Sequence, residues 1–404
     1  MSETRFIVRE PLLDAAKQIQ GYELSWHDGG ASGGMAGDDE LQELLVFVVS
    51  QLQSDEAASL YGDGVLFFET TPAVIASDVV ETLPAKGTVF RLSAADLSDS
   101  DTLNRVQELR QRGYGISLCN ADELPLGSPL LSVVNYVEGP FGSEELHART
   151  LARTDFKAAG VKIVARNLAG WEEFDACLAT GMQAFLGNLY MQPRPGQERK
   201  ELNSAQLIIV QLMEMVRQNA DVRQLEDVMK RDAALSYKLF RYINNAGFGL
   251  GAEIQSLRHA VTMLGYSPLY RWLSLLLATA STNGHGAVLM QTAIVRGRFA
   301  ELAAHGILPK NEAENLFVVG MFSLLDRLLG LPMAEVLAKV HLSDAVSQAL
   351  LTREGIYGPF LALAEACEAG NGDISTMADA LFISARRVNE AHLAALAWAQ
   401  GIKL

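Results

Sequence analysis

Runs of β-branched and aromatic residues alternate with helical stretches through the first half of the chain. The runs that predict strands lie at 5–9, 19–24, 65–69, 89–92, 116–119, 133–137 and 161–165, and the predicted helices lie at 40–58, 102–112, 143–159 and 171–180. Strand followed by helix, repeated along the chain, is typical of a mostly parallel sheet, and the number of repeats predicts a closed βα barrel. The first two runs have no helix between them, so we expect them to form an antiparallel hairpin.

The pattern changes after the Pro-containing segment 193–196, beyond which helices succeed one another to the end of the chain. Apolar residues then recur at helical spacing, as at Leu225, Val228 and Met229. Asp232 is placed to cap the helix that follows, and the segment 316–329 is apolar enough on every side to predict a central buried helix. We therefore predict two domains, an α/β barrel of the TIM type over residues 1–196 and an all-α domain over residues 197–404.

Composition supports two soluble domains. A chain of 404 residues is long for one core and comfortable for two. Hydrophobic residues make up 49% and charged residues 20%, which is typical of a globular protein. No apolar run approaches the roughly 20 residues that span a bilayer, and the N-terminus lacks an apolar signal core. We expect a cytoplasmic protein that does not associate with a membrane.

Charge argues against nucleic-acid binding, and cysteine spacing argues against a cysteine metal site. The formal net charge is −15, and such a surface repels phosphate backbones, so nucleic acid is not expected as a partner. The three cysteines, Cys119, Cys177 and Cys367, do not have the spacing of metal ligands and are predicted to be reduced, structural thiols.

Several motifs of the first half carry a family resemblance. The segments 9–14 (REPLLD), 21–24 (GYEL), 161–174 (VKIVARNLAGWEEF) and 187–193 (GNLYMQP) resemble EAL domains, the (β/α)8 barrels that hydrolyse cyclic di-GMP. In the second half, the segments 244–248 (NNAGF) and 256–265 (SLRHAVTMLG) resemble the HDOD module, a relative of the HD-GYP phosphodiesterases. Together the motifs cover nearly the whole chain, in the order of the EAL–HDOD signalling proteins of bacteria.

The resemblance implies a metal site in the barrel, which most of the residues here do not match. An EAL enzyme uses carboxylates and an Asn at the carboxyl ends of its strands to hold two divalent cations about 3.5–4 Å apart. Glu23 matches the Glu of the name motif. Glu69 stands near the position of the metal-binding Asn, Arg91 near that of a Glu, and Cys119 with Asn120 replaces the Asp-Asp pair. We expect these changes to abolish the metal site.

The remaining positions of the EAL pattern have changed too. The expected Lys falls on or beside Asn135, Arg166 lies where two carboxylates should be, and Leu186 replaces a Gln. An arginine at this place opposes divalent cations electrostatically, and Leu removes a polar contact to a guanine-type ligand. We therefore predict no metal, no cofactor and no phosphodiesterase activity, with Arg166 paired to Glu69 or Glu23.

The helical half has lost the corresponding enzyme signature. Hydrolases of the HD type carry His-Asp on a helix, and the equivalent positions here are Ser323 and Leu324. Neither side chain ligates a metal as His and Asp would. This domain is predicted to be inactive as well.

These observations predict a catalytically inactive EAL–HDOD signalling adaptor that works by protein–protein interaction. The resemblance implies partners such as cyclic di-GMP enzymes, histidine kinases or regulators of motility and biofilm. One alternative is a non-hydrolysing receptor for cyclic di-GMP or another nucleotide, in which Glu23 and Arg166 serve the ligand. The other is an active phosphodiesterase.

A partner surface is predicted on the helical domain, where aromatic and polar residues that often form interface hot spots gather. Its candidate residues are Tyr237, Arg241, Asn244, Asn245 and Arg271. The region 141–159, through which EAL barrels often dimerise, shows no conspicuous apolar patch. We therefore expect a monomer or a weak dimer.

Overall fold

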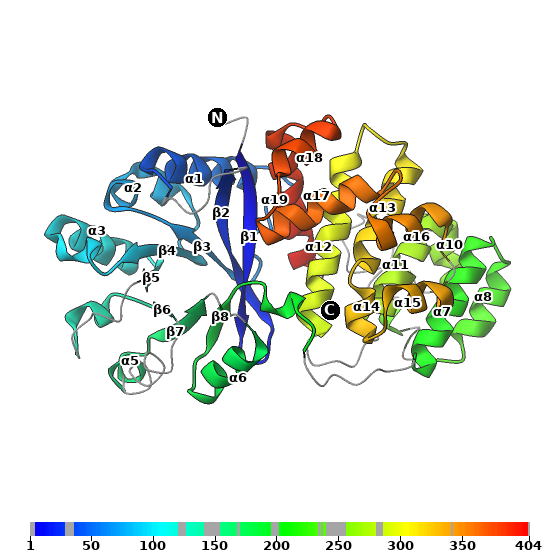
Figure 1. Cartoon of the computed structure of the whole chain (residues 1–404), viewed down its shortest axis with the longest axis horizontal. Helices are drawn as coiled ribbons and strands as arrows, with labels where there is room; N and C mark the ends of the chain where they lie inside the picture. Colours follow the sequence, from blue (N-terminus) through cyan, green and yellow to red (C-terminus); the bar gives the residue numbers. More distant parts are fainter. Residues whose placement is uncertain are drawn as a thin grey trace. The chain divides into compact units, whose positions relative to one another are not determined.

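The computed structural model describes two compact units. The residues described are 5–28, 36–119, 127–140, 154–166, 168, 170–194, 202–232, 235, 237–239, 256–279, 286–340 and 342–402. The first, here called the barrel unit, comprises Met1–Pro195 together with Ala366–Ser375, and the second, the helical unit, comprises Gly196–Glu365 and Thr376–Leu404 (Figure 1). The segment Ala366–Ser375, which the sequence analysis assigned to the helical half, thus belongs to the barrel unit.

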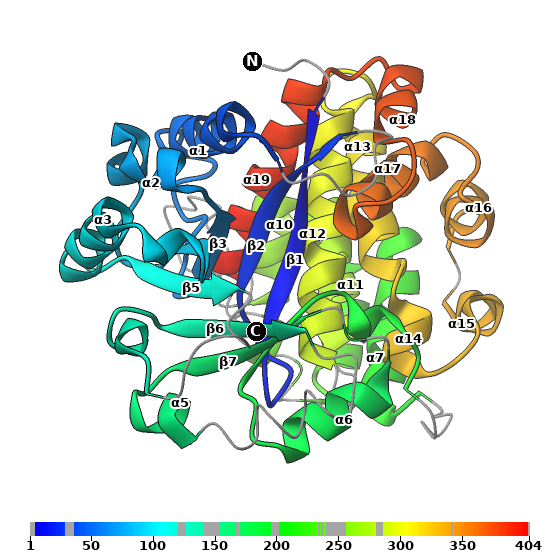
Figure 2. The ribbon, with the colours of Figure 1, turned by 60° about the vertical axis from the view of Figure 1, so that its left-hand side comes forward.

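The barrel unit contains a closed eight-stranded barrel, as predicted (Figure 2). β1 pairs antiparallel with both β2 and β8, and every other neighbouring pair is parallel, so the predicted hairpin is confirmed. The strands are β1 Arg5–Asp14, β2 Ile19–Asp28, β3 Val65–Glu69, β4 Thr88–Ser93, β5 Gly115–Cys119, β6 Tyr136–Pro140, β7 Lys162–Arg166 and β8 Ala184–Leu186.

Helices follow most of the strands of the barrel. They are α1 Asp38–Leu52, α2 Pro72–Ala76, α3 Ser100–Gln111, α5 Thr154–Ala158 and α6 Trp171–Ala179, with short 3-10 turns at Asp78–Thr82, Asp96–Ser98, Pro129–Ser132 and Leu189–Met191. Local capping sets where they begin. The Asp99 carboxylate accepts a hydrogen bond from the Thr102 N–H at 2.9 Å, which satisfies a free donor at the start of α3.

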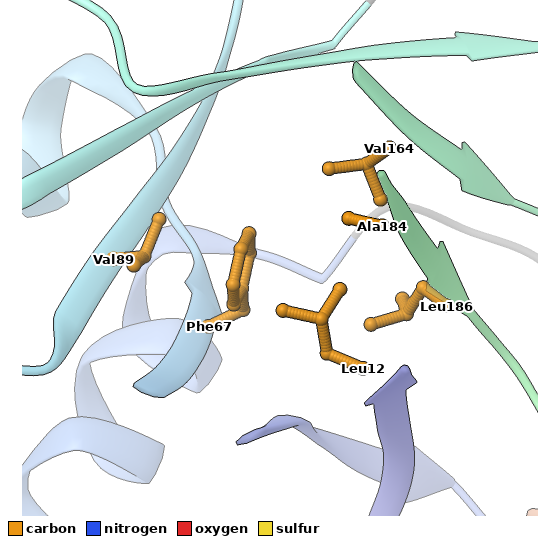
Figure 3. Packing of buried hydrophobic residues seen from close by; sticks show 6 residues of the cluster. All are labelled: Leu12, Phe67, Val89, Val164, Ala184 and Leu186. Carbon is orange, nitrogen blue, oxygen red and sulfur yellow. The ribbon is translucent and has the colours of Figure 1, made fainter. Parts of the chain in front are cut away.

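An apolar layer fills the inside of the barrel. Its members are Leu12, Phe67, Val89, Val164, Ala184 and Leu186, which point toward one another in Figure 3. Side chains on a strand alternate between the two faces, so residues two positions away from this layer also face the inside. Toward the carboxyl ends of the parallel strands those positions are Glu69, Arg91 and Arg166. The fold therefore places charged residues directly above the apolar layer, at the mouth of the barrel.

The segment Ala366–Ser375 packs against β1. Arg9 and Glu368, both at least 96% buried, form an ion pair with 3.2 Å between Nη2 and Oε2. Gly370 lies against the side chain of Val8, and the Asn188 amide donates to the Glu368 carbonyl at 3.5 Å. No helix connects β1 to β2, so this late segment supplies part of the cover that a βα unit would otherwise give.

The helical unit is built from helices alone among its described residues. They are α7 Ser204–Arg217, α8 Val222–Met229, α10 Leu257–Leu264, α11 Tyr266–Thr279, α12 Gly286–Ala304, α13 Lys310–Phe322, α14 Leu325–Leu329, α15 Met333–Lys339, α16 Asp344–Thr352, α17 Gly358–Ala369, α18 Ile374–Ala380 and α19 Ala385–Gly401. The last residues of α17 belong to the barrel unit. Asp232 caps as predicted, since its carboxylate accepts from the Leu235 N–H at 3.0 Å.

Helices α12 and α13 cross with their backbones in contact. A Cβ atom on Gly320 would lie 2.3 Å from the backbone nitrogen of Gly297, so only glycine fits there. The predicted central helix at 316–329 is buried but broken, because α13 ends at Phe322 and α14 begins at Leu325. Within the described ranges no single helix is long and apolar enough to cross a membrane, although the pair Lys310–Leu329 and Met333–Lys339, bent by 109°, passes that test on length and composition.

Candidate functional site

Charged side chains from six strands meet at the mouth of the barrel. They form what we call the charged layer: Glu10, Glu23, Glu69, Arg91, Glu138 and Arg166. The two arginines lie between the carboxylates rather than apart from them. The sequence analysis identified four of these residues and did not identify Glu10 or Glu138.

Glu138 is the centre of the layer. Its carboxylate, only 3% exposed, accepts hydrogen bonds from Arg91 Nε at 2.8 Å and from Ser117 Oγ at 2.6 Å, and Arg166 Nε lies 2.6 Å away. Burial acts to raise the pKa of this carboxyl group, but the two guanidinium groups outweigh it and hold the pKa of Glu138 below its ordinary value. A buried carboxylate with three donors is fully satisfied and stays ionised.

Arg166 also donates two hydrogen bonds to the Glu23 carboxylate, one from Nη1 to Oε1 at 3.0 Å and one from Nη2 to Oε2. Burial acts to lower the pKa of Arg166, and the hydrogen bonds to Glu23 more than offset this, so its pKa is raised above an already high value. The expected pairing of Arg166 with Glu23 is confirmed. Glu69 does not pair with Arg166 and instead lies 3.3 Å from Arg91.

Glu10 is the one carboxylate of the layer without an ion pair or hydrogen bond among the described residues. It stands opposite Glu23 in the antiparallel register of β1 and β2. Burial and the charge of Glu23 raise the pKa of Glu10.

The alternation of side chains along each strand could have revealed both missed residues. Leu12 and Tyr136 pack inside the barrel. Glu10 is two positions from Leu12 and Glu138 is two positions from Tyr136, so both glutamates face the inside as well.

Asn135 does not reach the mouth. It precedes β6, and its side-chain oxygen accepts the Ile116 N–H at 3.0 Å, near the start of β5. These are the amino ends of the parallel strands, whereas the mouth lies at their carboxyl ends. Asn135 therefore does not line the mouth, and the residue of β6 that faces the mouth is Glu138.

The other predicted mouth positions lie at the edge of the charged layer or below it. Cys119 ends β5 and is partly exposed, and burial raises the pKa of its thiol. Leu186 belongs to the apolar layer and offers no polar group. Asn120 lies outside the described residues. In the part of the chain that the structure describes, no group of three or more His, Cys, Asp or Glu residues is arranged to hold a metal ion.

An arginine also contacts the degenerate HD position of the helical unit. Ser323 and Leu324 lie buried at the break between α13 and α14. The guanidinium of Arg296, 4% exposed, donates to Ser323 Oγ at 3.1 Å and to Glu365 at 2.9 Å. Arg353 binds the same Glu365 carboxylate through two nitrogens, each at 2.9 Å.

Of the predicted partner residues, Tyr237 is 67% exposed, but Arg271 is not available at the surface. Its guanidinium pairs with Glu301 at 2.7 and 3.0 Å and lies 3.8 Å from the ring centroid of Phe317. The prediction of Arg271 as a surface hot spot was wrong. The sequence did not reveal this, because Glu301 and Phe317, which contact Arg271 in the fold, lie far from it in the sequence. Arg241, Asn244 and Asn245 lie outside the described residues.

Comparison with known proteins identifies a domain in the second half of the chain. Residues 201–345 match the HDOD domain model. The chain is 23% identical over 407 residues to "Uncharacterized protein YuxH" of Bacillus subtilis (strain 168), covering 98% of each chain. It is 26% identical over 383 residues to "Cyclic di-GMP phosphodiesterase CdgJ" of Vibrio cholerae, covering 90% of this chain and 85% of that one.

A solved EAL domain protein from Listeria monocytogenes EGD-e is similar at a TM-score of 0.37 with 14% identity, over 48% of this chain and 90% of that one. A likeness this distant carries no argument about this chain, whose family match is the HDOD domain over residues 201–345.

Proposed function

We propose that this protein, an EAL–HDOD chain, is a catalytically inactive signalling adaptor that works by protein–protein interaction. Its setting would be a cyclic di-GMP-related pathway in the bacterial cytoplasm, since one relative is named a cyclic di-GMP phosphodiesterase. Partners of the kind expected are cyclic di-GMP enzymes or histidine kinases.

One observation carries the proposal: three of the four carboxylates of the barrel mouth are paired with arginines. Hydrolysis by two metals needs carboxylates that are free to bind cations. Here Glu23 and Glu138 bind Arg166, and Glu138 and Glu69 bind Arg91. A guanidinium keeps its charge at any physiological pH and cannot activate a water molecule as a metal does. Displacing it would leave an unpaired buried charge, which is strongly unfavourable.

The helical unit supports the same conclusion. At the degenerate HD position, Ser323 and Leu324 stand in place of the two metal-binding side chains, and the buried Arg296 donates to Ser323. Neither unit then offers a metal site of its family's kind, so what the chain can still do is bind and position other molecules.

The test is a hydrolysis assay with the purified full chain and cyclic di-GMP in Mg²⁺ and in Mn²⁺. We expect no linear dinucleotide above the level of a Glu23→Ala variant. Turnover that survives Glu23→Ala indicates a contaminating enzyme. Turnover that Glu23→Ala abolishes would overturn the proposal and favour an active phosphodiesterase.

The alternative is a receptor that binds cyclic di-GMP or another nucleotide without cutting it. The feature that favours it is the pair of arginines, because guanidinium groups bind phosphate well. Against it, four carboxylates share the charged layer with only two arginines, which opposes an anionic dinucleotide. Titration of cyclic di-GMP with and without divalent metal separates the two, since saturable binding without turnover is the result a receptor requires.

The proposal includes a monomer or a weak dimer. Sedimentation at micromolar concentration checks this directly, and a tight dimer would contradict it.

A further inference from the structure

Phe382 has a backbone and an exposure that the fold does not explain. It lies between α18 and α19 with φ of 57°, in the left-handed region that bulky residues rarely adopt. Its side chain is 94% exposed, more than any other large hydrophobic residue that the structure describes. An aromatic ring here makes no ring contact with any described residue, so it does not stabilise the helical unit.

The local hydrogen bonds explain why the backbone is left-handed. The N–H of Phe382 donates to the Asp379 carbonyl at 3.0 Å, and that of Ile383 donates to the Ala378 carbonyl at 3.0 Å. This pair of bonds closes the C-terminus of α18 and requires a left-handed residue, for which glycine is strongly preferred. Phe at this position adds steric strain without any compensating contact among the described residues.

The other non-glycine residues with positive φ in the described chain each have a side-chain contact or a residue type that accounts for the left-handed backbone. Lys17 places its ammonium 5.9 Å from the ring centroid of Trp171. Asn219 ends α7 with the same pair of hydrogen bonds, and Asn tolerates this conformation. Arg353 binds Glu365 through its side chain. Phe382 differs from all three because its side chain has no partner within the described chain.

We propose that Phe382 is the anchor of an interaction surface, and that it inserts into an apolar, basic-rimmed pocket on a folded partner protein. This inference rests on the proposed adaptor function and deepens it. A single protruding ring complements a pocket rather than a flat face, and buried aromatic residues are typical interface hot spots.

Charge selects this partner over a membrane. The formal net charge of −15 opposes an anionic membrane, and Asp379, in the same turn as Phe382, is exposed. The nearby cations are engaged within the chain, since Arg386 donates to Glu390 at 2.8 Å and Arg387 donates to the His305 carbonyl. A basic rim is the complement of a surface with this excess of negative charge.

A second copy of the chain is opposed by its charge, because both copies would carry a formal net charge of −15. The partner is therefore expected to be a different protein.

The first test separates interaction from packing by thermal unfolding of the full chain. Phe382→Gly relieves strain and removes no internal contact, so the melting temperature should stay within about 1 °C of wild type or rise by up to about 4 °C. Arg353→Gly is the matched control, since it relieves the same kind of strain but breaks the pairing with Glu365 and should lower the melting temperature. A drop of several degrees for Phe382→Gly would show that Phe382 supports the fold and would overturn the inference.

The second test identifies the partner. A photo-crosslinking phenylalanine analogue at position 382, introduced in the bacterial cells that make the protein, should trap a protein that the same analogue at the exposed Leu351 does not. The trapped protein is then purified and titrated with the wild type, Phe382→Gly and Leu351→Ala. We expect Phe382→Gly to weaken binding by about 30-fold or more, as for an interface hot spot, and Leu351→Ala to leave it unchanged.

Three results would overturn the inference. One is equal affinity of Phe382→Gly and wild type for every trapped protein. The others are binding to anionic vesicles, or self-association, that Phe382→Gly abolishes, because these would assign Phe382 to a membrane or to a second copy. Hydrolysis of cyclic di-GMP by the wild type tests the adaptor proposal independently, so failure of the two ideas can be told apart.

Discussion

Arg166 and Glu138 project from neighbouring strands of the barrel, and the Arg166 Nε atom lies 2.6 Å from a Glu138 carboxylate oxygen. The register of β6 and β7 sets this distance, since Glu138 pairs with Val164 and Arg166 is two residues beyond. The same carboxylate also receives Arg91. The mouth of the barrel is thus held together by a buried carboxylate between two cations.

Glu138→Gln should destabilise the protein strongly. The change removes the charge that two guanidinium groups share and leaves both partly buried cations less well paired, which costs about 3 kcal/mol of the free energy of unfolding. Urea unfolding measures the loss. Glu69→Gln is the control, because its side chain is 35% exposed and its single pairing should contribute no more than about 1 kcal/mol. Equal losses for the two variants would argue against a central role for Glu138.

Glu10→Gln should stabilise the protein at neutral pH. Because burial and Glu23 raise the pKa of Glu10, ionising it costs more in the folded state than in the unfolded state. That cost is complete at neutral pH and disappears as the pH falls below the ordinary glutamate value of 4.5. The melting temperature of Glu10→Gln should therefore exceed that of the wild type at pH 7, and the two should converge toward pH 4.

The contribution of Glu138 to the free energy of unfolding depends on pH with the opposite sign to that of Glu10, and it serves as the comparison. Its pKa is lowered in the folded state, so its contribution to stability is present above 4.5 and is lost as the pH falls through the lowered value. A Glu10→Gln variant that is less stable than the wild type at pH 7 would show that Glu10 has a favourable partner.

Gly320→Ala should separate α12 from α13. A Cβ atom there would lie 2.3 Å from the backbone nitrogen of Gly297, and backbone cannot yield as a flexible side chain can. We expect a loss of about 3 kcal/mol or more in the free energy of unfolding, at the upper end of overpacking effects. Gly286→Ala, at the start of α12, meets nothing within 4 Å and should be neutral. An unchanged stability for Gly320→Ala would show that the two helices do not cross here.

Arg271→Ala should lower stability rather than impair binding alone. It removes the partner of Glu301 and the contact with the Phe317 ring, for an expected loss of about 3 kcal/mol. Tyr237→Ala, at an exposed position, should change the melting temperature little. If Arg271→Ala melts like the wild type, its pairing with Glu301 contributes little in solution.

The sequence predicted the class of fold well because long patterns carry it. Alternation of strands and helices gave the closed barrel and its opening hairpin, and helical periodicity gave the second unit. β8 was missed because Ala184–Leu186 is too short to show an alternating pattern. The grouping of Ala366–Ser375 with the barrel was missed because the contact of Glu368 with Arg9 has no local signal.

The site was predicted in part, for a similar reason. Motif alignment found Glu23, Arg91 and Arg166, which occupy positions of a known pattern. Glu138 was overlooked because the motif comparison named no residue of β6 that faces the mouth. Arg271 was taken for a surface residue because the residues that contact it, Glu301 and Phe317, lie far from it in the sequence.

The ion pair between Arg9 and Glu368 has a consequence for the order of folding on the ribosome. The carboxylate that pairs with the buried Arg9 of β1 lies 359 residues later in the chain. During synthesis, β1 therefore lacks this partner until every helix from α7 to α16 has been translated. Protection of β1 against proteolysis during synthesis should therefore appear late, after α17 has left the exit tunnel.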